Sequence, residues 1–494
     1  MSKNLLAIQE AKVLFKGNHA FENLNFIWNE GENWAVVAES GWLQTAFLET
    51  LRGNTVIPSG SVSRFFAREY IREKTADKEV HSFRDLLAYV SQRYEFRNKF
   101  NQQNFYFQQR FNSSESEETL TVKDYLKSIN SKLEGPWTLE NVMELLALNP
   151  LEEESLLKLS NGETRRLAIA AGLLRQPKLF LMDHPTTGLD IASRENFGNV
   201  LKTITKSGVR VLLTCAENEV PAGITHVATL DSGGVANQLS IENYAAQKTT
   251  WNKKEWNWTL LSQLLPTNSV TQESPVMLKN VSIHYDGKAI LDKINWEIKA
   301  GERWQLKGRN GSGKSTLISL LIGENPQAYS QNFQLFGRKR GTGESIWDIK
   351  RPTGFVAPEL ARFFPSNQTC RKVILSGLFD TMGLFKKVSP EQEKLANQWI
   401  SLFELEREAD QMITRVALEK QRWTLLARAL IKQPQFLILD EASQGMDEQQ
   451  RGLFKDTIQK ICENSPLSLL YVSHYDQDVP DAVTFQFDLD KTKT

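Results

Sequence analysis

The chain has 494 residues, of which 40% are apolar and 24% charged, and its 59 basic residues balance its 59 acidic ones. At roughly 150 residues a domain this length predicts about three domains, and a neutral chain is a poor candidate for binding nucleic acid through bulk charge. No apolar run approaches the roughly 18 residues of a membrane span, and polar residues from Gln9 onward interrupt the N-terminus before a signal peptide could form. The three cysteines show no metal spacing and predict a reducing compartment, so we expect a cytoplasmic protein.

An internal repeat organises the chain. The segment Gly31-Glu32-Asn33-Trp34 returns 270 residues later as Gly301-Glu302-Arg303-Trp304, whereas Asp183 returns 257 residues later as Asp440. Two copies of one domain explain both offsets, with thirteen extra residues in the first copy that we assign to an exposed insertion at 93–118. The predicted boundaries are 1–246 for the first copy, 247–273 for a linker and 274–494 for the second copy.

Each copy alternates apolar, strand-like runs with helical patterns, which predicts an α/β fold with a mainly parallel sheet. The runs Leu179–Met182 and Phe436–Leu439 are continuously apolar, as buried central strands are. The middle of each copy has helical patterns, at 122–149 and at 397–428, which predicts a helical subdomain beside each sheet.

In the first copy, Ser160-Asn161-Gly162-Glu163 precedes a predicted helix at 164–174. Ser160 and Glu163 have the spacing of an ordinary capping box. The same arrangement, a hydroxyl and free amides beside Gly162 at a helix N-terminus, is also an anion site. Because Asp183 follows some twenty residues later, at the end of an apolar strand, we favour the functional interpretation.

The linker, 247–273, is rich in Trp and Lys before a Pro-Thr-Asn-Ser turn. It is either a linker that packs one Trp-bearing helix or the last helix of the first copy. Its length and mixed charge exclude a long coiled-coil arm.

The second copy carries a phosphate-loop motif. A predicted strand, Trp304–Leu306, leads into Gly308-Arg309-Asn310-Gly311-Ser312-Gly313-Lys314-Ser315, and a helix follows from Thr316. The glycines let successive backbone N–H groups face a phosphate chain. Lys314 would then contact the β- and γ-phosphates, and the Ser315 hydroxyl suits a Mg²⁺ ligand.

Four further positions in this copy fit nucleotide chemistry. Asp440 and Glu441 end the strand at 436–439, where the first carboxylate could hold Mg²⁺ and the second could activate water. His474 follows a predicted strand, Leu469–Val472, and could touch the γ-phosphate. Tyr285 lies sixteen residues before Gly301 and could stack on a base, although an ordinary strand aromatic is the alternative.

This ordered set of motifs resembles the nucleotide-binding domains of ATP-binding-cassette (ABC) proteins, as a tandem pair that covers nearly the whole chain. The segment Phe336–Lys350 resembles bacterial tandem cassette ATPases associated with molybdate transport. The resemblance implies ATP hydrolysis with Mg²⁺ and two cassettes that pair head to tail within the chain. Each nucleotide would lie between one copy's phosphate loop and the other copy's Ser-x-Gly-Glu segment.

Against that family pattern, the first phosphate loop has decayed. Gln44 replaces the lysine, Ala38 and Leu43 replace glycines, and Trp42 would crowd a phosphate. His184 stands where the catalytic glutamate belongs and Ala216 where the histidine belongs. In the second copy Ala417 and Glu419 replace the Ser and Gly of the Ser-x-Gly-Glu segment.

The intact parts therefore belong to one composite site. They are Tyr285, the loop from Gly308 to Thr316, Asp440, Glu441 and His474 of the second copy, with Ser160, Gly162 and Glu163 of the first. We expect Glu441 and His474 to be catalytic and Ser315 and Asp440 to bind the metal. One departure affects this site: the family's glutamine is missing near Ala357-Pro358-Glu359, while Gln92 occupies the equivalent place in the first copy.

The resemblance implies an ATPase that works with separate membrane permease subunits, with molybdate or a related oxyanion as cargo. The alternative is a soluble regulatory or ribosome-associated tandem cassette ATPase. A role in DNA repair is a third hypothesis, and the neutral charge, which predicts no direct nucleic acid binding, does not favour it. We expect a cytoplasmic location, either free or peripheral at the inner face of the membrane.

Overall fold

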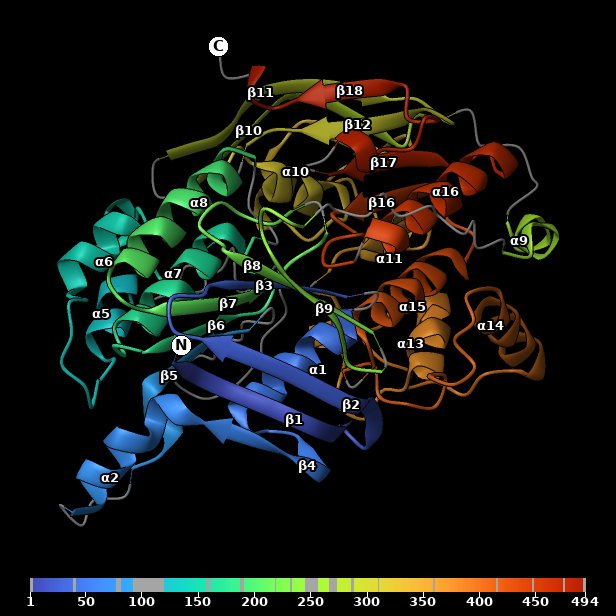
Figure 1. The fold of residues 1–494 in the computed structure, drawn as a ribbon. Coiled ribbons are helices and arrows are strands. Elements are labelled where there is room, and N and C mark those ends of the chain that lie inside the picture. Colours follow the sequence, from blue (N-terminus) through green and yellow to red (C-terminus); the bar gives the residue numbers. More distant parts are fainter. Residues whose placement is uncertain are drawn as a thin grey trace. The chain divides into compact units, whose positions relative to one another are not determined.

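The computed structural model describes seventeen stretches of the chain: 3–38, 41–76, 81–91, 120–156, 159, 161–186, 191–217, 219–231, 233–244, 256–265, 273–285, 288–309, 311–358, 360–414, 416–446, 448–473 and 476–491. Their contacts divide them into two compact units, unit 1 with the described residues of 3–244 and unit 2 with those of 256–491. Figure 1 shows unit 1 in blue to green and unit 2 in yellow-green to red.

Unit 1 combines an antiparallel and a mainly parallel sheet with helices. Its strands are β1 (Asn4–Phe15), β2 (Asn18–Asn29), β3 (Trp34–Ala38), β4 (Val56–Arg64), β5 (Leu87–Val90), β6 (Leu179–Met182), β7 (Arg210–Thr214), β8 (His226–Leu230) and β9 (Val235–Ser240). Its helices are α1 (Gly41–Arg52), α2 (Arg68–Ala76), α5 (Val122–Lys127), α6 (Leu139–Leu145), α7 (Asn161–Leu173) and α8 (Ile191–Lys206), and a 3₁₀ turn, η1 (Phe65–Ala67), precedes α2.

The two sheets of unit 1 differ in strand direction. One has the order β2-β1-β4 and is antiparallel. The other has the order β5-β6-β7-β3-β8-β9 and is parallel except for its edge strand β9. In Figure 1 the helices α5 to α8 gather on one side of β6 and β7, and β1, β2 and β4 lie on the other.

Unit 2 repeats this plan. Its strands are β10 (Val276–Tyr285), β11 (Lys288–Ile298), β12 (Arg303–Lys307), β13 (Phe333–Leu335), β14 (Arg338–Lys339), β15 (Thr353–Val356), β16 (Phe436–Asp440), β17 (Ser468–Val472) and β18 (Phe485–Asp488). Its helices are α9 (Trp258–Leu264), α10 (Lys314–Leu321), α11 (Ile346–Lys350), α12 (Leu360–Phe363), α13 (Cys370–Ser376), α14 (Pro390–Leu402), α15 (Leu418–Leu430) and α16 (Glu448–Asn464). The sheet β11-β10-β13-β14 is antiparallel, and the sheet β15-β16-β17-β12-β18 is parallel throughout.

The apolar residues of the central strands alternate between two cores, one on each face of the parallel sheet. In β6, Leu179 and Leu181 face the core shared with the antiparallel sheet, while Phe180 and Met182 face the helical core. In β16 the same alternation separates Phe436 and Ile438 from Leu437 and Leu439. Continuous apolarity over these runs therefore reflects burial on both faces, as predicted.

These observations confirm the predicted fold class, two α/β units with mainly parallel sheets and helices. The strands predicted at 179–182, 304–306, 436–439 and 469–472 and the helices predicted at 164–174 and from Thr316 are present, with ends that differ by up to three residues. The helical regions predicted at 122–149 and 397–428 each contain more than one helix, and α14 begins at Pro390, before the second region. The extra segment predicted at 93–118 lies outside the described residues. Among the described helices, none is long and apolar enough to cross a membrane.

The described part of the linker, 256–265, packs into unit 2. Trp256 is 5% exposed, and its indole N–H donates to Thr457 Oγ1 at 3.0 Å. Leu261 and Leu264 of α9 join the same core. The alternative in which this helix closes the first copy is therefore wrong, because its apolar face is buried in the second.

Candidate nucleotide-binding site

The loop between β12 and α10 adopts a backbone that only glycine takes easily. Gly308, Gly311 and Gly313 have φ values of 149°, 79° and 107°. A Cβ on Gly313 would lie 2.8 Å from Leu291 Cδ2, so a side chain there would meet the core as well as backbone strain. The loop is thus curled tightly between the strand and the helix, as the motif predicts.

The side chains of this loop are arranged around its own carbonyl groups. Lys314 Nζ donates to the carbonyl oxygens of Gly308 at 2.6 Å and Arg309 at 3.0 Å. Ser312 Oγ is buried and has no hydrogen-bond partner among the described residues. A buried hydroxyl without a partner costs about 1–3 kcal/mol, and a phosphate oxygen would satisfy it. The loop therefore fits the triphosphate that its sequence predicts.

The start of α10 supplies the other predicted groups. Ser315 is half-buried and Thr316 buried in the first turn of this helix, whose N-terminus favours anions. Asn310 lies outside the described residues.

Asp490, which the sequence analysis missed, holds the outer side of the loop. Its Oδ2 accepts from the backbone N–H of Arg309 at 2.8 Å, and its Oδ1 lies 3.5 Å from Arg309 Nε. Asp490 follows β18, which pairs with β12 in parallel register. Only this pairing brings residues 181 positions apart together, so no local pattern could have identified the contact.

Asp440 and Glu441 lie at the same edge of the sheet as the phosphate loop. The order β16-β17-β12 places one strand between them, a separation of about 10 Å at ~4.8 Å per strand. The carboxyl ends of parallel strands meet at one edge, where ligands of open α/β sheets bind. The topology therefore brings Lys314, Asp440 and Glu441 to one side of unit 2.

Glu441 is fixed in an unusual conformation. Its φ is 47°, its backbone N–H donates to the carbonyl of Val472 at 3.0 Å, and its Oε2 accepts from Gln444 Nε2 at 2.6 Å. A left-handed φ is costly for a residue with a side chain and is held here by these contacts. The carboxylate is thus positioned rigidly at the end of β16.

The remaining predicted residues divide between described and undescribed positions. Tyr285 is half-buried at the end of β10, and its hydroxyl accepts from Asn325 Nδ2 at 3.0 Å. Gly162 is buried and Glu163 half-buried in the first turn of α7 in unit 1. Ser160 and His474 lie outside the described residues, as do Gln92 and Glu359.

In unit 1 helix α1 covers the positions that match 311–313 of the phosphate loop. Helix α1 begins at Gly41, so Trp42 and Leu43, which match Ser312 and Gly313, are already helical. Leu43 cannot easily take the φ of 107° seen at Gly313, and the helix is its ordinary alternative. The ring of Trp42 packs 5.9 Å from that of Phe15.

Gln44, at the position of Lys314, is 2% exposed and hydrogen-bonded on both ends of its amide. Its Nε2 donates to the carbonyls of Val36 at 2.9 Å and Cys215 at 2.8 Å. Its Oε1 lies 2.7 Å from His184 Nε2. Because an amide oxygen can only accept, this nitrogen of the His184 ring carries the proton. The side chain at the lysine position is thus fully hydrogen-bonded within unit 1.

Asp183, the match of Asp440, is also enclosed by unit 1. It is 2% exposed, and its carboxylate accepts from Thr214 Oγ1 at 2.8 Å and Thr45 Oγ1 at 3.1 Å. The backbone N–H of His184 donates to Thr214 Oγ1 at 2.8 Å, although φ at His184 is 46°, as at Glu441. The left-handed backbone conformation is therefore shared by His184 and Glu441, while the side chains differ.

The helix that follows the second copy's decayed segment lacks its cap. Helix α15 has Ala417 at its N-cap, without a side-chain hydrogen bond. Burial raises the pKa of Glu419 in its first turn. The loss of phosphate binding at this segment stays a prediction.

One arginine in each copy ties a helix to the parallel sheet: Arg165 of α7 in unit 1 and Arg422 of α15 in unit 2. The two residues are 257 positions apart, so the repeat offset could have identified the pair. Arg422 Nη1 donates to the carbonyl of Pro358 at 2.8 Å, and Arg165 Nη1 donates to that of Ser91 at 2.6 Å. Both acceptors follow the edge strand of their sheet. The helical part and the sheet edge are therefore tied in the same way in both copies.

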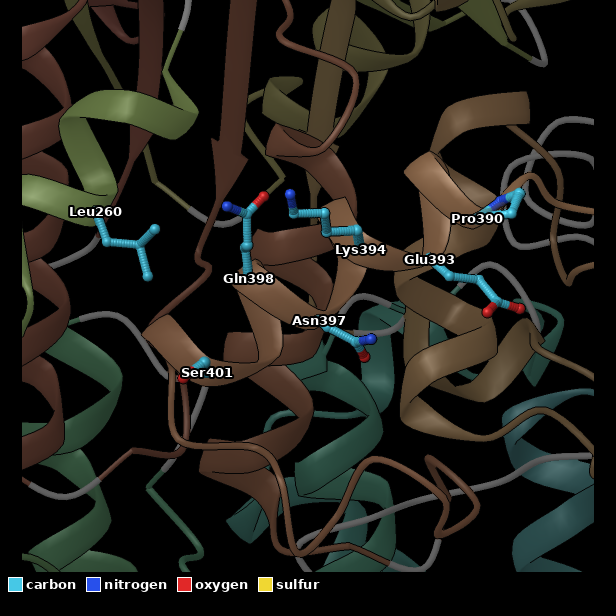
Figure 2. A pocket seen from close by; sticks show the side chains of 7 residues that line it. All are labelled: Leu260, Pro390, Glu393, Lys394, Asn397, Gln398 and Ser401. Carbon is cyan, nitrogen blue, oxygen red and sulfur yellow. The ribbon is translucent and has the colours of Figure 1, made fainter.

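Unit 2 also has an open groove away from the phosphate loop. It has a volume of about 460 Å³ and lies between α9 and α14. Figure 2 shows Leu260 of α9 on one side and Lys394, Asn397 and Gln398 of α14 on the other. No described residue of the phosphate loop lines it, so it is separate from the nucleotide site.

Comparisons with known proteins agree with this geometry. A family model described as "ABC transporter" matches residues 21–187 and 291–444. The ABC transporter ATP-binding protein ModF of Escherichia coli is 34% identical over 343 residues, covering 67% of this chain and 69% of its own. An ABC transporter ATP-binding protein of Schizosaccharomyces pombe is 29% identical over 482 residues, covering 96% of this chain and 95% of its own.

Solved structures with the same fold are more distant in sequence. A model of ribosome-bound archaeal Pelota and ABCE1 has a chain with a TM-score of 0.58 at 19% identity, covering 94% of this chain and 73% of that one. A structure titled RNase-L Inhibitor has a TM-score of 0.51 at 18% identity, covering 96% of this chain and 86% of that one. At these identities the likeness is one of fold.

Proposed function

Because the chain belongs to the ABC transporter family of ATP-hydrolysing proteins, with two copies of its domain, we propose that only the second copy's phosphate loop holds a hydrolysed ATP. The first copy would be a non-catalytic partner. One observation carries this proposal: α1 begins at Gly41 in unit 1, whereas the matching residues 311–313 of unit 2 form a curled, glycine-rich loop before α10.

The roles of the second copy's residues follow from their positions. The N–H groups of the curled loop and the start of α10 bind the phosphates, and Lys314 would exchange its two carbonyl partners for phosphate oxygens. Ser315 and Asp440 would hold Mg²⁺, which neutralises phosphate charge when bound. Glu441 would accept the proton of the attacking water, since its carboxylate is held at the end of β16.

Four residues enter the proposal through the family resemblance alone. His474 would contact the γ-phosphate, and Ser160, Gly162 and Glu163 of the first copy would complete the same site. The retention of a Ser-x-Gly-Glu segment in the copy without a phosphate loop supports this assignment, because the segment has no nucleotide of its own to serve.

We propose further that the ATPase drives a separate membrane permease. The description of the Escherichia coli relative as an ABC transporter ATP-binding protein supports this role. An oxyanion such as molybdate is the proposed cargo, on the resemblance of 336–350, and the permease rather than this chain would bind it. A ribosome-associated role is the second candidate, favoured by the fold of a ribosome-bound neighbour. Co-purification with membrane protein or with ribosomes distinguishes the two.

The asymmetry between the two copies is tested by the same substitution at two residues that match across the repeat. Glu441→Gln should slow ATP hydrolysis by about 10²–10⁴-fold with ATP still bound, because a positioned proton acceptor is lost. His184→Gln, its match in the first copy, should leave the rate within about twofold. Steady-state ATPase assays and ATP-binding titrations measure both. Equal losses in the two variants would show that both copies hydrolyse ATP.

A further inference from the structure

A second cavity lies in unit 1 at the end of the parallel sheet where the strands begin, opposite the edge that carries Asp183. Its volume is about 670 Å³, within the range of small-molecule sites. Its walls come from the start of β1, the turn η1 and the start of β6, and include the apolar side chains of Leu5, Phe65, Phe66 and Leu179. Part of the cavity wall is thus apolar.

Basic side chains outnumber acidic ones around this cavity. Lys3, Arg68, Lys178 and Arg210 line it together with Glu30 and Glu69, which leaves two positive charges in excess. Glu30 is paired with Lys3 at 3.8 Å, and the guanidinium of Arg68 lies 4.2 Å from the ring centre of Phe65. Within the described part of the chain, the side chains of Lys178 and Arg210 form no ion pair or hydrogen bond.

A backbone hydrogen bond joins Lys178, the residue before β6, to Arg210, the first residue of β7. The N–H of Arg210 donates to the carbonyl of Lys178 at 3.0 Å, and the N–H of Lys178 donates to that of Leu86 at 2.9 Å. Arg210 lies two residues before Leu212 and so shares the strand face that turns toward the antiparallel sheet. Both side chains line the cavity, where a bound anion would be attracted to their charges.

The second copy shows that the fold does not require these cations. There the N–H of Ser468 donates to the carbonyl of Gln435 at 2.9 Å, and the N–H of Gln435 to that of Pro352 at 2.8 Å. The backbone arrangement is the same, but Gln435 and Ser468 occupy the places of Lys178 and Arg210. The positive charges at these two positions are therefore present in the first copy and absent from the second.

We propose that this cavity of the first copy binds a small organic phosphate ester. Two excess positive charges match the charge of a phosphate monoester, which is about −1.5 to −2 at neutral pH. The guanidinium of Arg210 suits two phosphate oxygens, Lys178 adds a point charge, and the apolar wall accepts the organic body. The site is separate from the ATP site and does not depend on the proposed function.

The test uses phenyl phosphate as the probe and phenol as its uncharged control. Calorimetric titrations are made in the full chain carrying Lys314→Ala, so that the phosphate loop does not compete. We expect saturable binding of one phenyl phosphate per chain and none of phenol. Exchange for the second copy's residues, Lys178→Gln with Arg210→Ser, should weaken binding about tenfold or more, since two charge-assisted contacts are lost. Lys202→Gln, an exposed lysine of α8 outside the cavity, should not weaken it.

A second measurement keeps the proposal falsifiable if the double variant does not fold. In the chain without substitutions, phenyl phosphate should protect Lys178 but not Lys202 from acetylation, as mass spectrometry measures. Absence of saturable binding, equal binding to the double variant, or equal acetylation of Lys178 with and without the probe would overturn the proposal. Binding of the chain to phosphatidic acid vesicles without binding of phenyl phosphate would also overturn it, because the ligand would then be a membrane surface.

Discussion

At the residue scale, one substitution shows how a ligand site becomes a structural core. Gln44 stands where Lys314 stands in the other copy, yet its amide is buried and bonded to Val36, Cys215 and His184. A lysine there would place a charge among carbonyls, with phosphate as its partner. An amide satisfies the same carbonyls without any ligand. At this position the first copy has internal hydrogen-bond partners in place of a ligand.

This contrast predicts opposite effects for Gln44→Ala and Lys314→Ala. Gln44→Ala removes the three hydrogen bonds of a buried amide and should lower the free energy of unfolding of unit 1 by about 2–4 kcal/mol, with unchanged ATP affinity. Lys314→Ala should abolish ATP binding with little effect on stability, because the side chain is only half-buried. Denaturant titrations beside ATP titrations measure both. A Gln44→Ala protein of normal stability would contradict the role of the network.

Asp490 gives a second prediction at this scale. Asp490→Asn should raise the KM for ATP about threefold to tenfold with little change in kcat, because the carboxylate positions the loop at Arg309 without reaching the reacting atoms. Its match in the first copy, Asp231, accepts from the backbone of Gly233 and Gly234 and serves as the control. An equal rise in KM for Asp231→Asn would assign the effect to general loosening of the fold.

At the element scale, the sequence predicts what depends on local patterns. The run 436–439 forms the strand β16, because a strand buried on both faces needs apolar residues throughout. The residues 308–315 form the curled loop, because positive φ values need glycine. The start of α1 at Gly41 has no comparable pattern in the sequence. It depends on Gln44 reaching Cys215, 171 residues away, and on Trp42 packing against Phe15. Contacts between distant strands decide it, and a single sequence does not display them.

The end of α15 carries a pH-dependent contact. Lys432 Nζ donates to the carbonyl of Lys350 at 2.6 Å and pairs with Asp380, which ties α15 to α11 and to the loop after α13. Burial lowers the pKa of Lys432 from 10.5 to about 8, although Asp380 opposes the shift. In the unfolded chain the lysine keeps its proton up to about pH 10, so the unfolded state binds more protons between pH 8 and 10.5.

The unfolding free energy should therefore rise with pH across that window through this residue. Relative to Lys432→Met, which does not titrate, unit 2 of the unsubstituted chain should gain about 1–3 kcal/mol between pH 7.5 and 10. Urea unfolding at both pH values measures the difference. Identical pH slopes for the two proteins would show that Lys432 titrates normally in the folded state.

At the scale of the whole molecule, the two copies share their framework and differ at the positions that would touch nucleotide. Arg165, which ties α7 to the sheet of unit 1, matches Arg422, which ties α15 to the sheet of unit 2. The left-handed residue after the aspartate is also present in both copies, as His184 in one and Glu441 in the other. The divergence is therefore chemical rather than architectural, which supports the proposal that one copy hydrolyses ATP.

If the copies share that nucleotide, a change in the first copy must slow hydrolysis in the second. Gly162→Asp should reduce ATP hydrolysis at least tenfold with ATP still bound, because a carboxylate in the first turn of α7 would repel the γ-phosphate. Glu419→Gln, in the second copy's decayed segment, should leave the rate unchanged. Thermal unfolding of both variants checks that the fold is retained. Normal turnover in Gly162→Asp would show that α7 does not contribute to the site.

The hydrogen bonds of Gln44 within unit 1 also have a thermodynamic consequence. A unit that needs no ligand has a stability set by its own sequence, whereas a unit that binds ATP gains free energy with every rise in ATP concentration. In one chain the first unit is then a constant internal standard, and the second a reporter of nucleotide supply. The difference between the unfolding free energies of the two units, followed as ATP is added, would then give the affinity of the second unit for ATP. No second protein would be needed for calibration.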